Sequence, residues 1–141
     1  MSISVREQLL ANIVTAVSGQ YRVTSAPLDD AELPVCVVSE GEEAATSDAV
    51  HDAIDIELPI VVAKGSLAAD DSPETLRAKG NELLASIITE MYADETFGDL
   101  AESVEYTAGA IISEPGKRCL AEAQFIVRYQ IESGDPFNRP S

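Results

Sequence analysis

The sequence is poor in several residue types on which common functional sites depend. Its single histidine, His51, excludes metal sites built from clustered histidines. It has no tryptophan, three phenylalanines and four tyrosines, which predicts an aliphatic core and disfavours an aromatic-lined ligand pocket. The two cysteines, Cys36 and Cys119, lie in separate strand-like segments. We expect two free, buried thiols in a reducing compartment in preference to a disulfide.

Basic residues are also scarce. Nine Lys and Arg stand against 25 Asp and Glu, which gives a formal net charge of −16 at pH 7. Proteins bind DNA by neutralising its phosphates with basic residues, so we do not expect this acidic chain to bind nucleic acid directly. The same charge opposes self-association unless ions screen it.

Long hydrophobic runs are missing as well. Polar residues interrupt every apolar stretch before the roughly 18 residues that a membrane-spanning helix needs. The N-terminus lacks the basic region and small-residue cleavage pattern of a signal peptide. We therefore expect no membrane contact and synthesis in the cytoplasm. A length of 141 residues with 45% hydrophobic content predicts one domain with a substantial core.

Two amphipathic helices are indicated. Ser4 followed by Glu7 is a capping box that predicts a helix start, and Gly19 predicts its end. A second helix is predicted to begin at Asp71 or Ser72, with Pro73 in its first turn. Its predicted buried stripe consists of Leu76, Gly80, Leu83, Leu84, Ile87, Ile88 and Met91.

The remaining apolar segments predict strands over 21–26, 34–40, 53–65, 103–112 and 118–132. The order α-β-β-β-α-β-β favours an α+β two-layer domain over residues 1–132, with a C-terminal extension over 133–141. In it, a mostly antiparallel sheet of four to five strands carries both helices on one face. Pro59 lacks a ladder donor, which suggests an edge strand or a bulge in 53–65. Residues 41–52 show no periodicity and are expected to be a loop that is either mobile or functional.

The last predicted strand has two different faces. Its odd-numbered residues are apolar and predict a core face. The opposite face combines apolar, amide and charged side chains, a composition typical of a protein interface. A solvated face with two isolated aliphatic residues is the alternative. This mixed face consists of Leu120, Glu122, Gln124, Ile126, Arg128 and Gln130.

The chemistry of an enzyme is not indicated. Positions 111 and 118, where a phosphate-binding loop ending in Gly116-Lys117 would need Gly and Ser or Thr, hold Ile and Arg. The acidic groups at 29–32 and 40–43 lack the glycine and terminal glutamate of a calcium loop. No serine lies in a Gly-x-Ser-x-Gly elbow. We expect no catalytic residue, no resident metal and no cofactor.

Several segments together resemble a known family. They are the capped opening helix, "DDAELPVCVV", "AIDIELPIVV", "SPETLRAKGNELLASIITEM" and the ending "AQFIVRYQIESGDPF". In apolar spacing and turn placement the chain is similar, nearly end to end, to the tail terminator proteins of long-tailed bacteriophages, the minor tail protein U family of lambda-like phages. The tail after Tyr129 is longer than in some members of that family.

The resemblance implies a structural virion protein. Members form a hexameric ring on the finished end of the tail tube, which ends tube polymerisation and offers a surface for head attachment. The implied partners are further copies of the chain, the tail tube protein and the head–tail connector or neck protein, with DNA passing through the lumen without specific binding. The implied location is the virion tail, and the host cytoplasm during assembly. Divalent cations would promote assembly by screening the acidic subunits.

Three regions are the candidate contact sites under this resemblance. The first is the segment 41–52, with Glu42, Glu43 and His51. The second is the mixed strand face at Gln124, Ile126, Arg128 and Gln130. The third is the tail at Asp135, Pro136 and Phe137, for which a frayed terminus is the alternative. A different neck or head-closure component, a small ligand-binding α+β module and an acidic mimic of DNA remain rival interpretations.

Overall fold

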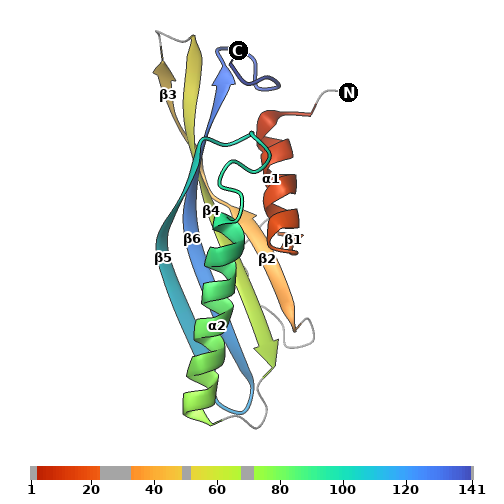
Figure 1. Ribbon diagram of the computed structural model, residues 1–141, viewed down its shortest axis with the longest axis vertical. Coiled ribbons are helices and arrows are strands. Elements are labelled where there is room, and N and C mark those ends of the chain that lie inside the picture. The colour runs from red at the N-terminus through yellow and green to blue at the C-terminus, as the bar shows by residue number, and fades with distance from the viewer. Residues whose placement is uncertain (1–2, 23–32, 49–51, 68–71, 141) are drawn as a thin grey trace.

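The computed structural model describes residues 3–22, 33–48, 52–67 and 72–140. His51 and the whole acidic group at 29–32 lie outside these residues. The elements, in chain order, are α1 (Val5–Ala16), β1 (Gln20–Tyr21), β2 (Val35–Glu40), β3 (Ala44–Asp48), β4 (Ala53–Leu67), α2 (Pro73–Tyr92), β5 (Ser103–Glu114) and β6 (Arg118–Glu132). Figure 1 shows both helices against the same side of a long, twisted sheet.

The predicted α+β class is confirmed. The sheet has the order β1-β2-β4-β6-β5, and β3 pairs with β4 beyond the end of β2. All pairings are antiparallel except that of β1 with β2. A tight hairpin joins β5 to β6, and Gly116 takes φ +78° in its turn, where other residues would be strained.

The helix starts follow the predicted caps. The Ser4 side chain accepts a hydrogen bond from the Glu7 N–H at 3.1 Å, and Ser72 accepts one from the Thr75 N–H at 3.2 Å. Pro73 occupies the first turn of α2, where its missing N–H costs no hydrogen bond. Neither described helix combines the length and the apolarity that a membrane crossing requires.

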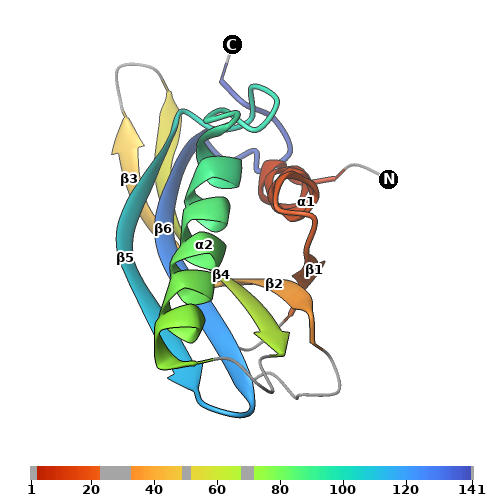
Figure 2. The same cartoon turned by 60° about the horizontal axis from the view of Figure 1, so that its bottom comes forward.

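The core lies between the helices and one face of the sheet (Figure 2). Alternate residues of β4 and β6 point into it, among them Leu58, Ile60, Phe125 and Val127, which are at most 1% exposed. Gly80 of α2 is buried against β5. A side chain at this position would collide with the Cγ2 methyl of Ile111, so the close packing requires glycine. This close approach lets a 20-residue helix lie flat on the hairpin.

Two strand predictions need correction, and a third lies mostly outside the described residues. Within the described residues the sheet has six strands, because part of the predicted loop 41–52 forms β3. The sequence Ala-Ala-Thr-Ser-Asp has little β-propensity of its own, and its strand conformation comes from pairing with β4. The strand predicted at 21–26 is described only as the two residues of β1, and positions 23–26 lie outside the described residues.

The second correction concerns Pro59. Its strand, β4, lies inside the sheet, with β6 on one side and β2 followed by β3 on the other. The pairing with β2 ends at Ile60 and the pairing with β3 begins at Glu57. Pro59 sits between them and uses its carbonyl to accept the Gly41 N–H at 2.9 Å. The missing donor therefore falls where the neighbouring strand changes, which makes proline compatible with a central strand.

Candidate interaction surfaces

The face of the sheet that the helices leave uncovered, here called the open face, carries an apolar end. Leu33 and Val37 are each 8% exposed and pack with half-buried neighbours on this side. Ile112 of β5 and Leu67 of β4 lie at the same end and stay about half exposed. The apolar end comprises Leu33, Val35, Val37, Ala63, Leu67, Ile112 and Leu120.

The other end of the open face is a charged network across three strands. Arg128 on β6 lies between Glu57 of β4, at 2.9 Å, and Glu105 of β5, at 3.3 Å. Gln130 donates to Asp55 Oδ1 at 2.5 Å. Hydrogen bonds from Arg128 to Glu105 and then to Glu57 raise the pKa of its guanidinium, so the charge is permanent. The network holds the side chains of the mixed face in fixed positions. Its carboxylates outnumber its one cation, so its net charge stays negative.

The four predicted residues of β6 therefore lie together on the open face. Gln124 is exposed, whereas Ile126, Arg128 and Gln130 are half-buried between their neighbours in the sheet. The alternation read from the sequence predicted this orientation. Their role in binding a partner stays a prediction.

Side-chain interactions connect α1 to the last residue of β2 and to the segment that follows it. Arg6 donates through Nε to Glu40 at 2.9 Å and also forms an ion pair with Glu43. The Tyr21 hydroxyl donates to the second carboxylate oxygen of Glu40 at 2.9 Å. Of the predicted residues here, Glu42 and Glu43 are both exposed, and Glu43 is paired with Arg6 of the same chain.

The C-terminal tail folds back on the start of α1. The Val5 N–H donates to the Pro136 carbonyl, and the Glu132 N–H donates to the Asn138 carbonyl, each at 2.9 Å. The Asp135 carboxylate accepts the Phe137 N–H at 3.1 Å. These bonds give the tail a defined turn, in contrast to a frayed end. Phe137 itself remains 47% exposed.

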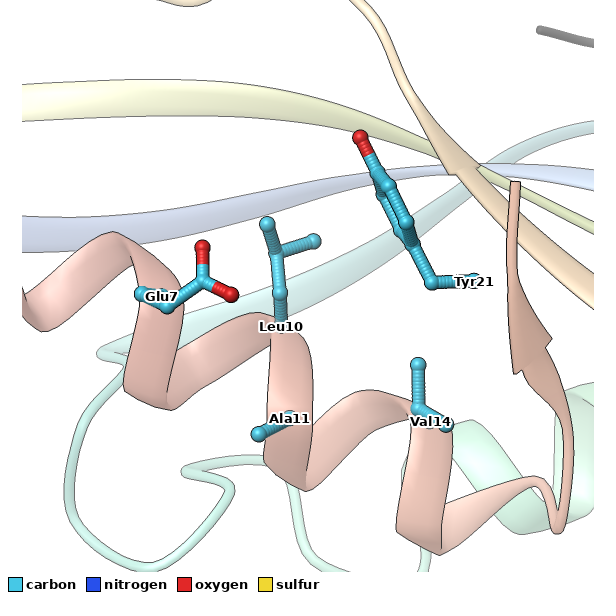
Figure 3. Close-up of a pocket in the computed structure, with 5 residues that line it drawn as sticks. All are labelled: Glu7, Leu10, Ala11, Val14 and Tyr21. Carbon is cyan, nitrogen blue, oxygen red and sulfur yellow. The ribbon is translucent and has the colours of Figure 1, made fainter. Parts of the chain in front are cut away.

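A groove that the sequence analysis missed lies between α1 and β1 (Figure 3). It has a volume of about 350 Å³, and Figure 3 shows Glu7, Leu10 and Val14 projecting from α1 toward the side on which Tyr21 lies. The spacing of Glu7, Leu10, Ala11 and Val14 marks a second stripe along α1, which could have signalled this groove.

A second hollow lies between the end of α1, β2 and α2. Lys64 donates to Glu90 at 2.5 Å and to Ser86 at 2.9 Å, so its charge is already paired. Burial raises the pKa of the Cys36 thiol to about 11, which leaves it protonated and unreactive at neutral pH. Among the residues that the structure describes, no group of three or more His, Cys, Asp or Glu could hold a metal ion.

Comparisons with known proteins find little. No family model matches the chain, and no curated protein matches it. Among solved structures, the chain is similar to a chain of the virion of a native gene transfer agent particle, with 15% sequence identity and a TM-score of 0.38. The similarity covers 90% of this chain and 92% of that one. The likeness is too distant to say anything about the function of this chain.

Proposed function

We propose that the chain is a structural subunit of a phage-like virion, namely a tail terminator that forms a ring on the end of the tail tube. The observation that carries the proposal is the open face, with a half-exposed apolar end and a charged network beside it. Together with the sequence resemblance, it favours a protein that works through contacts with other subunits. Its action involves no bond made or broken.

The mechanism is steric. A ring that matches the last ring of tube subunits on one side only would stop growth, because no further complementary edge is offered. A closed ring needs a heterologous contact, in which two different patches of each subunit meet. Six copies of a chain with net charge −16 would gather about −96. Such a ring would let DNA pass through its acidic lumen without adhering, and it would need salt or divalent cations to assemble.

The rival interpretation as a small ligand-binding module has less support. Such a module needs several polar groups that converge in an apolar pocket. The groove between α1 and β1 has one carboxylate, Glu7, and one hydroxyl, on Tyr21, which is already bonded to Glu40. A different neck component of the same virion would share the open face and differs only in its partner.

The test is deletion of the gene from the genome that encodes it, followed by electron microscopy of the particles. The proposal predicts tails of uncontrolled length and free heads, restored by the wild-type gene in trans. Restoration should fail with Ile112→Asp together with Leu67→Asp, which charge the apolar end at two exposed positions. Asp99→Asn, at an exposed position in the loop between α2 and β5, is the control and should restore normal tails. Normal tails after the deletion would refute the proposal.

A further inference from the structure

We propose that Phe137 of one copy of this chain inserts into the groove between α1 and β1 of the next copy. The inference rests on the proposed function, because a ring requires two different patches that meet at each boundary. Phe137 is the projecting patch, and the groove lined by Glu7, Leu10, Ala11, Val14 and Tyr21 is the receiving one.

Phe137 is presented in a fixed position. The preceding residue accepts the Val5 N–H at 2.9 Å, and Asp135 accepts the N–H of Phe137 itself at 3.1 Å. The aromatic side chain nevertheless stays 47% exposed and does not line the groove of its own chain. An apolar group that is already ordered loses little conformational entropy when it binds, which favours it as an anchor.

The groove has the form that an aromatic ring requires. Leu10, 5% exposed, is buried, and Val14 is half-buried, while the small side chain of Ala11 takes up little space. The Tyr21 ring is 46% exposed, and its hydroxyl is held by Glu40 at 2.9 Å. A phenyl ring entering the space of about 350 Å³ would contact the Tyr21 ring and the aliphatic side chains together.

Charge complementarity identifies the occupant as a second copy. Glu7 is exposed where it lines the groove, and Arg139 follows Phe137 by two residues and is also exposed. Within the described residues, Arg139 has no ion-pair partner, whereas Arg6, Lys64 and Arg128 are each paired with a carboxylate. In a chain with so few cations, Arg139 beside Phe137 matches an apolar groove that has an acidic edge.

Cysteine cross-linking between two populations tests the contact directly. Glu7→Cys and Arg139→Cys, at the two positions that would pair across the contact, are purified separately, mixed with magnesium and oxidised. Both variants keep Phe137. A disulfide-linked dimer should form in the mixture, where the new cysteine of one variant meets that of the other. It should form in neither variant alone, because the proposed contact joins two different positions of the chain. The native cysteines do not interfere, since Cys119 is buried and Cys36 has a raised pKa.

Affinity measurements supply the second readout. Phe137→Ala should weaken self-association at least about tenfold. Ile3→Ala, which removes an apolar side chain that is 57% exposed near the same end of α1, should leave it unchanged. Glu7→Arg and Arg139→Glu should each weaken association, and the double variant should recover most of the loss.

The outcomes separate this inference from the proposed function. If the wild-type chain associates into rings but Phe137→Ala associates equally well and no cross-link forms, the Phe137 contact is wrong and the ring stands. If Phe137→Ala still forms rings but no longer restores tails in the deletion strain, Phe137 contacts another virion protein and the inference is overturned. If the wild-type chain does not associate at any ionic strength or magnesium concentration, both fail.

Discussion

The backbone N–H of Val5 donates to the carbonyl of Pro136 at 2.9 Å, so the first residue of α1 is bonded to the C-terminal tail. The first N–H groups of a helix have no partner within the helix, and the tail supplies one. The same turn holds Phe137 at the surface. One local structure thus stabilises a helix end and presents the proposed anchor.

Removal of residues 136–141 should lower the free energy of unfolding by about 1–3 kcal/mol, because two backbone hydrogen bonds of the tail are lost. Urea unfolding followed by circular dichroism measures the change. The control is removal of residues 140–141, which keeps both bonds and should leave the unfolding midpoint in place. Equal stability of all three chains would show that the tail does not support α1.

Gly80→Ala should destabilise the fold, although alanine is the better helix former. The added methyl would collide with Ile111 Cγ2, a short branch that cannot swing away. We expect a loss of about 1–3 kcal/mol from overpacking, larger than the gain of roughly 1 kcal/mol in helix propensity. A double-mutant cycle with Ile111→Ala should show that the two changes are coupled. A stabilised Gly80→Ala variant would contradict the packing of α2 on β5.

Tyr129 should make the fold sensitive to alkali. Burial raises its pKa to about 12 from the ordinary value of 10.0, so the folded state holds the phenol proton more tightly than the unfolded state. Stability is therefore intact below pH 10 and declines as the pH rises from about 10 toward 12. Over this range the free energy of unfolding should fall less steeply with pH for Tyr129→Phe than for the chain with Tyr129. Both chains should carry Cys36→Ala, because Cys36 titrates in an overlapping range. Identical slopes would contradict the prediction.

Arg128→Ala should reduce assembly while leaving the stability of the fold nearly unchanged. Its two carboxylate partners are about half exposed, and solvent-exposed ion pairs contribute little to stability. The melting temperature should stay nearly unchanged, while self-association or restoration of tails is reduced because the shape of the open face depends on this residue. A large drop in melting temperature would assign Arg128 to the fold instead.

Much of the fold could be predicted because it follows from local chemistry. The caps at Ser4 and Ser72 and the alternation in β4 and β6 each depend on residues close together in the sequence. The strand β3 could not be predicted, since its residues become a strand only through a neighbour that follows in the chain. The position of Pro59 likewise makes sense only once the ends of β2 and β3 are known.

The candidate surfaces, too, could be predicted only where they depend on a single strand. Alternation within one strand was enough to group Gln124, Ile126, Arg128 and Gln130 on one face. It gave no indication of their partners Glu57, Glu105 and Asp55, which come from other strands. The groove at Tyr21 escaped prediction because it joins a helix to a strand of two residues.

The central claim is that this chain acts by assembling into a closed ring. Light scattering of the purified protein, with and without magnesium and across protein concentrations, tests it most directly. Six copies of the 15.0 kDa chain give about 90 kDa, and we expect this mass with magnesium, together with six-fold rings in negative-stain images. A mass that stays at one chain under every condition would contradict the claim.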